Sequence, residues 1–181
     1  AGDVNADGYA DVLIGAPGIG TGAPGTANLF LGGPGGLSAT PSWQASGDHD
    51  GATFGLGIST AGDINGDGYA DILVGAPDWV LDFSPPDGQP HRGKAYAYLG
   101  NAAGVPTAPV WFVAGDDDSS SLGQFVASAG DVNGDGYGDI LIAAPGDNNG
   151  QSGEGQVYLF QGGADVPAAT PDWFRTGGQV A

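Results

Sequence analysis

The chain repeats one stretch three times: GDVNADGYADVLIGAP at residues 2–17, GDINGDGYADILVGAP at residues 62–77 and GDVNGDGYGDILIAAP at residues 130–145. Equivalent positions lie 60 and then 68 residues apart. In each copy an acidic, glycine-rich loop is followed by a run of aliphatic residues, a pattern typical of a turn that leads into a β-strand. A repeat of this length indicates that each copy builds one structural unit, which stacks on the next.

Other features recur in step with this stretch. A strand-like segment ending in glycine follows each copy, at residues 29–32, 96–100 and 158–162, and one tryptophan follows each segment. A Phe-Gly or Leu-Gly pair precedes the second and third copies, and no segment shows a sustained helical period. We therefore expect four short strands per unit. In the second unit they are predicted at residues 54–60, 71–75, 95–99 and around Trp111.

Four strands in a repeat of this size predict an all-β fold, a β-propeller of four-stranded antiparallel blades with three repeats per chain. Residues 1–181 form a single propeller segment in this interpretation. Its predicted parts are repeat 1 at about 1–53, which lacks its first strand, repeat 2 at about 54–121, repeat 3 at about 122–177, and a C-terminal strand at 178–181 that belongs to the next blade. Because propellers typically have 4–8 blades, three blades form only a partial ring.

The composition supports a folded, strongly acidic domain. Glycine accounts for 37 of the 181 residues, but 40% of the residues are hydrophobic, which is enough for a core. The net charge is −18, with only three Lys and Arg residues, so binding to nucleic acid or insertion into an anionic membrane is not expected. No apolar run reaches the ~18 residues of a membrane helix. The chain has no Cys and no Met and begins at Ala1, so we expect a piece of a longer translation product.

The acidic loop has the pattern Asp-x-Asn-x-Asp-Gly-x-x-Asp, which is typical of calcium binding. Side-chain oxygens at positions 1, 3 and 5 converge when the chain curls, and Ca²⁺ takes 6–8 oxygen ligands. We expect position 7 to add its backbone carbonyl and position 9 a last carboxylate. The predicted ligands of three Ca²⁺ ions per chain are Asp3, Asn5, Asp7, Tyr9 and Asp11; Asp63, Asn65, Asp67, Tyr69 and Asp71; and Asp131, Asn133, Asp135, Tyr137 and Asp139.

Two other interpretations of this loop are weaker. An EF-hand needs flanking helices and Glu at position 12, where this chain has Ile14, Val74 and Ile142. Asp, Asn and Gly also favour ordinary turns, but three copies in register, each with three crowded carboxylates, weigh against a turn without a cation. Mg²⁺ fits less well, because it demands tighter octahedral geometry.

Phe54-Gly55 and Gly75-Ala76-Pro77 bracket the second loop, and this arrangement resembles the FG-GAP repeat of integrin α-subunit propellers and related bacterial proteins. The resemblance implies calcium in the loops between the first and second strands, on one face of the propeller. It also implies that ligand and partner subunit meet the opposite face. Repeat 3 departs from the pattern with Leu122-Gly123 and Ala143-Ala144-Pro145, and integrin propellers have seven blades.

These features predict a calcium-stabilised propeller module for protein recognition or adhesion, extracellular or at the cell surface. We expect no enzyme activity, because no nucleophile–base pair stands out. A lectin-like, glycan-binding propeller and a non-catalytic accessory domain of a secreted enzyme are the alternatives. Trp79 and Phe83, in a segment present only in repeat 2, are candidates for an exposed contact or for loop packing. His49 and His91 lack the nearby N or S ligands of a zinc site.

The ends of the chain suggest how the ring is completed. Residues 178–181 resemble residues 123–127 with one residue missing. We expect this C-terminal strand to complete the first blade of a second copy, which gives a homodimeric, six-bladed ring with two-fold symmetry. The alternative is that the chain is part of a longer propeller. In either case a protein or glycan ligand is expected on the face opposite calcium.

Overall fold

The computed structural model describes residues 1–80, 91–117, 119–147 and 154–178, and these fold into antiparallel sheets without any helix. The strands within the described residues are β1 Val12–Ala16, β2 Thr26–Phe30, β3 Trp43–Ser46, β4 Ile58–Gly62, β5 Asp71–Ala76, β6 Lys94–Tyr98, β7 Trp111–Ala114, β8 Phe125–Gly130, β9 Asp139–Ala144, β10 Gln156–Phe160 and β11 Trp173–Thr176. They form the sheets β1–β2–β3, β4–β5–β6–β7 and β8–β9–β10–β11. The predicted all-β, partial propeller fold is confirmed.

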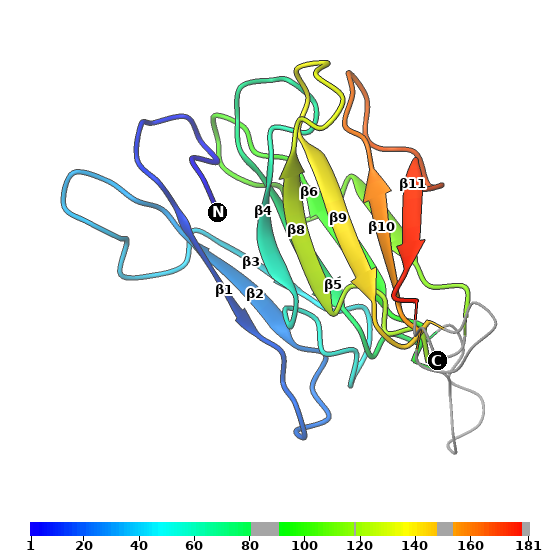
Figure 1. Ribbon diagram of the computed structural model, residues 1–181. Coiled ribbons are helices and arrows are strands. Elements are labelled where there is room, and N and C mark those ends of the chain that lie inside the picture. The colour runs from blue at the N-terminus through cyan, green and yellow to red at the C-terminus, as the bar shows by residue number, and fades with distance from the viewer. Residues whose placement is uncertain (81–90, 118, 148–153, 179–181) are drawn as a thin grey trace.

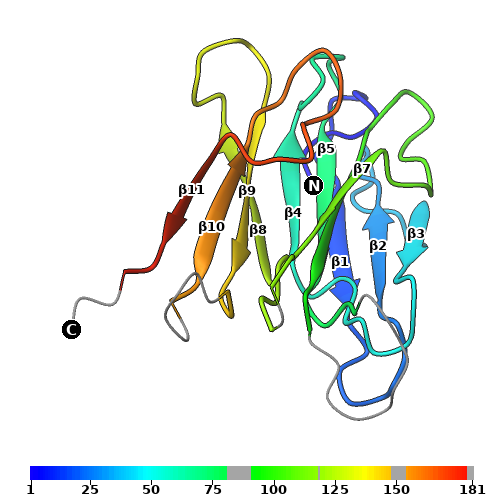
Figure 2. The same cartoon turned by 90° about the vertical axis from the view of Figure 1, so that its right-hand side faces the viewer.

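The three sheets stand side by side as successive blades, which the two views in Figures 1 and 2 show. Blades 2 and 3 meet along their first strands, β4 and β8, which lie next to each other in Figure 1. Blade 1 has three strands in the described structure, and a single bridge between Gly2 and Asp11 stands where blades 2 and 3 pair their first strands. The repeating sequence therefore produces a repeating sheet.

The Phe-Gly pair lies in a turn, and the prediction that the first strand starts at residue 54 was wrong. Strand β4 begins at Ile58 because Gly55 has a left-handed backbone, with φ of 91°. The N–H of Gly55 donates to the carbonyl of Gly75 (2.9 Å), and the N–H of Gly75 donates to the carbonyl of Gly57 (2.7 Å). This turn holds the start of β4 against the end of β5.

The same turn brings neighbouring blades into backbone contact. A Cβ atom on Gly15 would lie 1.9 Å from the carbonyl oxygen of Gly55, and a Cβ atom on Gly75 would lie 1.8 Å from that of Gly123. Gly15 and Gly75 are thus required, since any side chain at these positions would push the next blade away. Blade 3 has Ala143 at this position.

The core is divided between the two blade junctions. Trp43 of blade 1 packs edge-on against Tyr98 of blade 2, with ring centroids 5.0 Å apart, and Trp111 of blade 2 packs in the same way against Phe160 of blade 3, at 5.1 Å. These two tryptophans are only 5% and 6% exposed, whereas Trp173 of blade 3 is 45% exposed. Trp43 and Trp111 therefore pack between blades, and Trp173 faces outward.

Candidate metal centres

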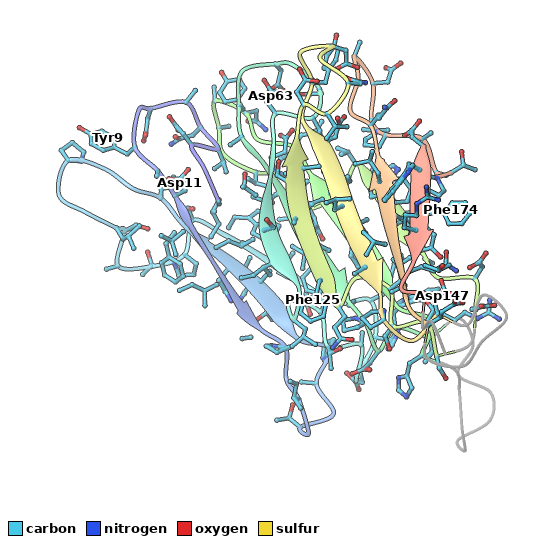
Figure 3. All side chains as sticks on the ribbon, in the orientation of Figure 1. Tyr9, Asp11, Asp63, Phe125, Asp147 and Phe174 are labelled. Carbon is cyan, nitrogen blue, oxygen red and sulfur yellow. The ribbon has the colours of Figure 1, made fainter. Side chains whose placement is uncertain are left out.

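The three acidic loops lie at one end of the blades. Residues 63–70 connect β4 to β5, residues 131–138 connect β8 to β9, and residues 3–10 lead into β1. Figure 3 shows Asp63 at this end of the molecule and Asp147 at the other. The structure thus gathers the predicted metal ligands on one face, and the segments that carry Asp78 and Asp147 lie on the opposite face.

Within each loop the side-chain oxygens turn inward onto the backbone amides of the loop itself. Asp63 accepts hydrogen bonds from the N–H groups of Asp67 (3.0 Å) and Gly68 (2.8 Å). Asn65 Oδ1 accepts from Asp67 N–H at 3.2 Å, and Asp67 Oδ1 accepts from Tyr69 N–H at 3.0 Å. Loop 1 (residues 3–10) and loop 3 (residues 131–138) repeat these bonds of loop 2 (residues 63–70) at 2.8–3.2 Å. Positions 1, 3 and 5 are therefore held close together in all three copies.

The aspartate at position 9 is buried at the base of each loop. Asp71 is fully buried, and its two oxygens accept the N–H groups of Ile64 and Gly100, both at 2.8 Å. Asp11 and Asp139 make the equivalent bonds, to Val4 and Gly32 and to Val132 and Gly162. Each of these carboxylates ties its loop to the glycine that follows the third strand of the blade. This anchoring role was not predicted from the sequence, although the glycine that recurs after each third strand indicated it.

Burial raises the pKa of Asp71 to about 7, and the nearby charges of Asp67 and Asp63 raise it further against the two backbone hydrogen bonds. Burial is the larger cause, and the charges of Asp67 and Asp63 are a smaller one. A cation bound in the loop would offset the charge of these carboxylates.

The donor chemistry of the loops fits a hard divalent cation. Each loop offers three carboxyl groups, one amide oxygen and backbone carbonyls, without any basic side chain. Among the described residues, however, no group of three or more His, Asp or Glu side chains is arranged to hold a metal ion as it stands. The oxygens at positions 1, 3 and 5 are engaged with backbone amides and retain further lone pairs. Closing a coordination shell would require these side chains to turn toward the ion.

Adjacent loops also touch. A Cβ atom on Gly66 would lie 2.7 Å from Cε1 of Tyr137, so the tyrosine of loop 3 packs over loop 2. Tyr9 of loop 1 is exposed, at 41%.

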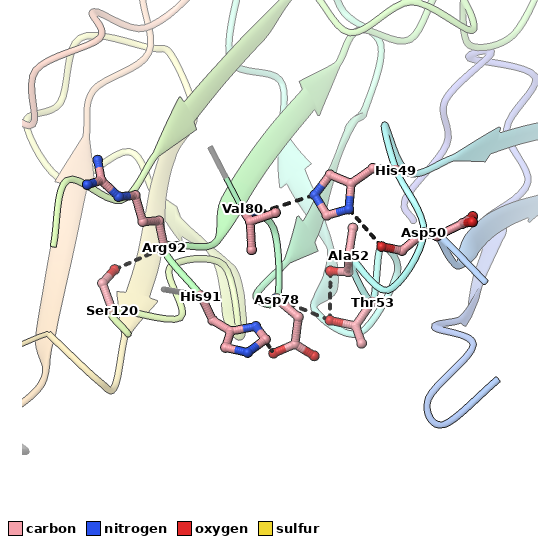
Figure 4. Close-up of polar contacts among 9 residues, drawn as sticks. All are labelled: His49, Asp50, Ala52, Thr53, Asp78, Val80, His91, Arg92 and Ser120. Carbon is pink, nitrogen blue, oxygen red and sulfur yellow. Dashed lines mark hydrogen bonds and ion pairs between the residues drawn. The ribbon is translucent and has the colours of Figure 1, made fainter. Parts of the chain in front are cut away.

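The histidines on the opposite face have separate partners (Figure 4). His49 Nε2 accepts the N–H of Val80 at 3.2 Å, and His91 Nδ1 lies 3.5 Å from a carboxylate oxygen of Asp78. Trp79 packs against the core beneath the Nζ atom of Lys94, which lies 4.9 Å from its ring centroid. Loop packing is thus the alternative that the structure shows for Trp79. Phe83 lies outside the described residues.

Comparison with known proteins gives matches to two family models. The FG-GAP repeat model matches residues 54–98 and 123–160, and the FG-GAP-like repeat model matches residues 3–74. Similar proteins include integrin alpha-PS2 of Drosophila melanogaster, 37% identical over 134 residues, which are 71% of this chain and 9% of that protein. Integrin alpha-6 of Gallus gallus is 31% identical over 154 residues, covering 81% of this chain and 13% of that protein.

The chain spans about a tenth of the length of these relatives. Among the described residues, no helix is long and apolar enough to cross a membrane.

Proposed function

Because the chain belongs to the FG-GAP repeat family, we propose that it is a calcium-stabilised β-propeller module for protein recognition or adhesion, exposed outside the cell or at its surface. The matches to integrin α-subunits support this assignment, as does the acidic surface, which favours cations over nucleic acid and membranes. The module is non-catalytic in this proposal.

The carrying observation is the repetition of one oxygen arrangement in three loops, each above a buried aspartate. Each loop would hold one Ca²⁺ through the side chains at positions 1, 3, 5 and 9 and the carbonyl at position 7. When bound, the ion neutralises crowded carboxylates. Since the unfolded chain does not hold these oxygens together, calcium stabilises the folded state by mass action. The metal acts here as a structural element.

The ligand of the module, a protein or a glycan, would bind on the face opposite calcium. The segments that join one blade to the next and the second strand to the third reach that face, which Figure 3 marks with Asp147. Loops on a rigid propeller can vary in sequence without disturbing the sheets, so this face is suited to recognition.

A second copy of the chain would complete the ring. The outward side of blade 3 carries Phe125, Val157 and Trp173, which are 64%, 37% and 45% exposed. The equivalent sides of blades 1 and 2 are buried by the blade that follows them. An exposed apolar sheet face of this kind favours association. A six-bladed homodimer is our proposal, and completion by further blades of a longer chain is the competing outcome.

Thermal unfolding in millimolar calcium and in excess chelator tests the metal's role. Calcium should raise the melting temperature of the native chain, and Asp63→Asn with Asp67→Asn should lose about a third of that gain, since one loop of three is removed. Asp50→Asn, an exposed carboxylate in the connection between β3 and β4, at the other end of the blades, is the matched control. Equal melting temperatures with and without calcium would refute the stabilising role.

Light scattering after size exclusion tests the second copy. A particle of twice the chain mass that dissociates on Trp173→Asp supports the homodimer, whereas a monomer at high concentration would exclude it.

A further inference from the structure

A cavity of about 460 Å³ opens between blades 2 and 3, and its lining runs from Asp147 to residues 169–171, which precede β11. Its wall includes acidic, amide and aromatic side chains: Asp116, Asp117, Asp147, Gln156, Tyr158 and Phe174. Among the described residues that line it, none is Lys or Arg. A cavity with acidic and aromatic walls is suited to an organic cation.

The junction between blades 1 and 2 has the same backbone at the equivalent place. Lys94 lies opposite Ala76 and Ala114 in the sheet of blade 2, and Gln156 lies opposite Ala144 and Thr176 in that of blade 3. The segments that follow the second strands correspond as well. The Trp79 N–H donates to Ala76 and its carbonyl accepts from Gly93, and Asp147 makes the same two bonds, with Ala144 and Gly155.

In the first of these junctions the chain supplies its own cation. Lys94 is 8% exposed, and its Nζ atom lies 2.7 Å from Asp48 Oδ2. The same Nζ atom lies 4.9 Å from the ring centroid of Trp79, 4.7 Å from that of Tyr96 and 4.3 Å from that of Phe112. One carboxylate and three aromatic rings therefore surround a single ammonium group, an arrangement that binds cations when water is excluded.

In the second junction the surrounding side chains are again aromatic and acidic, but a neutral side chain stands where the first junction has the lysine. Tyr158 and Phe174 stand where blade 2 has Tyr96 and Phe112, and their ring centroids lie 6.4 Å apart. Gln156 replaces the lysine, and Asp147, only 2% exposed, replaces Trp79.

The carboxyl groups of this second junction are crowded. Asp147 accepts a hydrogen bond from the Tyr158 hydroxyl. Burial raises the pKa of the Asp147 carboxyl, and the neighbouring Asp117 and Asp116 raise it further. At the first junction, by contrast, hydrogen bonds from Lys94 and Tyr96 outweigh burial and hold the pKa of Asp48 below its ordinary value.

We infer that the cavity between blades 2 and 3 binds an ammonium group presented by a partner, namely the side chain of a lysine in a protein ligand. The internal lysine at the neighbouring junction is the template: the ligand would place its ammonium among Asp147, Tyr158 and Phe174 where blade 2 keeps its own. The choice of a protein as the source of the lysine rests on the proposed recognition function. The affinity of the cavity for an ammonium group does not depend on that proposed function.

The experiment is an NMR titration of the calcium-loaded chain with Nα-acetyl-lysine N-methylamide. Saturable shifts of the amides of Asp147 and Tyr158 are expected, and the uncharged norleucine analogue should bind roughly tenfold more weakly. Gln156→Lys, which gives blade 3 the residue of blade 2, should block binding at least tenfold because its ammonium fills the cavity. Asp165→Asn removes one exposed carboxylate elsewhere and should leave binding unchanged.

Asp147→Asn is the second variant, and it should also weaken binding, by removing a charge without adding bulk. A chain that binds the lysine and norleucine probes equally, or a Gln156→Lys chain that is folded and still binds, overturns the inference. Methylammonium binding as tightly as the lysine probe would contradict a protein side chain as the ligand. Calcium-dependent melting of the same samples reports on the proposed function separately, so either can fail alone.

Discussion

Blades 2 and 3 have the same strand order and the same acidic loop, yet their surroundings differ. Blade 2 is covered on both sides, and all residues of β5 and β6 are buried. In the part of the chain that the structure describes, blade 3 is covered on the side of blade 2 and open on the other, and three of the four residues of β11 are exposed. The repeat sequence therefore specifies a blade, whereas burial of its outward side comes from the neighbour, as expected for a repeat architecture in which each unit contacts only the next.

The largest difference should appear when the equivalent tryptophans are removed. Trp111→Ala empties a closed junction and should lower the free energy of unfolding by about 3–5 kcal/mol. Trp173→Ala, on the outward side, should cost about 1 kcal/mol or less in a dilute chain. Chemical denaturation at fixed calcium measures both.

The comparison sharpens if the protein concentration is varied. A cost of Trp173→Ala that grows with concentration would show that a second copy covers blade 3. Equal costs for the two variants in dilute monomer would contradict the assignment of Trp173 to an open face.

The glycines at the blade junctions should give the next largest effect. Gly75→Ala places a Cβ atom against the carbonyl of Gly123 and should destabilise by roughly 1–3 kcal/mol, because the blades must separate. Ala143→Gly, at the same position of blade 3, relieves no contact with a following blade in the described structure and should cost less than about 1 kcal/mol. Thermal unfolding of the two single variants and the wild-type chain makes the comparison.

Asp48 follows β3 of blade 1, and Asp116 occupies the equivalent place after β7 of blade 2. Substitution of these two carboxylates should change the stability in opposite directions. Asp48→Asn removes the partner of the buried Lys94 ammonium and should cost about 1–2 kcal/mol, a value reduced because Asp48 itself is half-exposed. Asp116→Asn removes one of several crowded negative charges and should be neutral or slightly stabilising. Denaturation midpoints at low ionic strength test this, and a stabilising Asp48→Asn would contradict the role given to the ion pair.

The smallest expected effect is on the pH dependence of stability, which should differ between the carboxyl groups of Asp48 and Asp147. Asp48 should ionise below its ordinary range, so its contribution to stability is present at neutral pH and is lost as the pH falls through its folded pKa. Asp147 has a raised pKa, so its ionisation costs stability, and this cost disappears as the pH falls. Carboxyl NMR shifts during an acid titration distinguish the two, with Lys94, Tyr96 and His49 facing the first and Tyr158, Asp116 and Asp117 facing the second.

Much of the blade structure can be predicted from the sequence because the three repeats are closely similar. The aliphatic runs after the acidic loops and the aromatic segments before glycine predict strands within one or two residues of β5 and β6. The start of β4 was missed. Phe54-Gly55 directly precedes a strand-like stretch of sequence, but Gly55 has a positive φ and therefore lies in a turn. The grouping of Lys94 with three rings depends on side chains from three segments, which no local pattern reports.

The contact between glycines at successive junctions also determines the curvature of the assembly. Gly15 against Gly55 and Gly75 against Gly123 fix the same close spacing twice, and with it the same rotation from blade to blade. At the third position Ala143 carries a methyl group where Gly15 and Gly75 have none. In the proposed ring this methyl group would meet the next blade, so we expect a wider step at that junction and expect the ring to open there first.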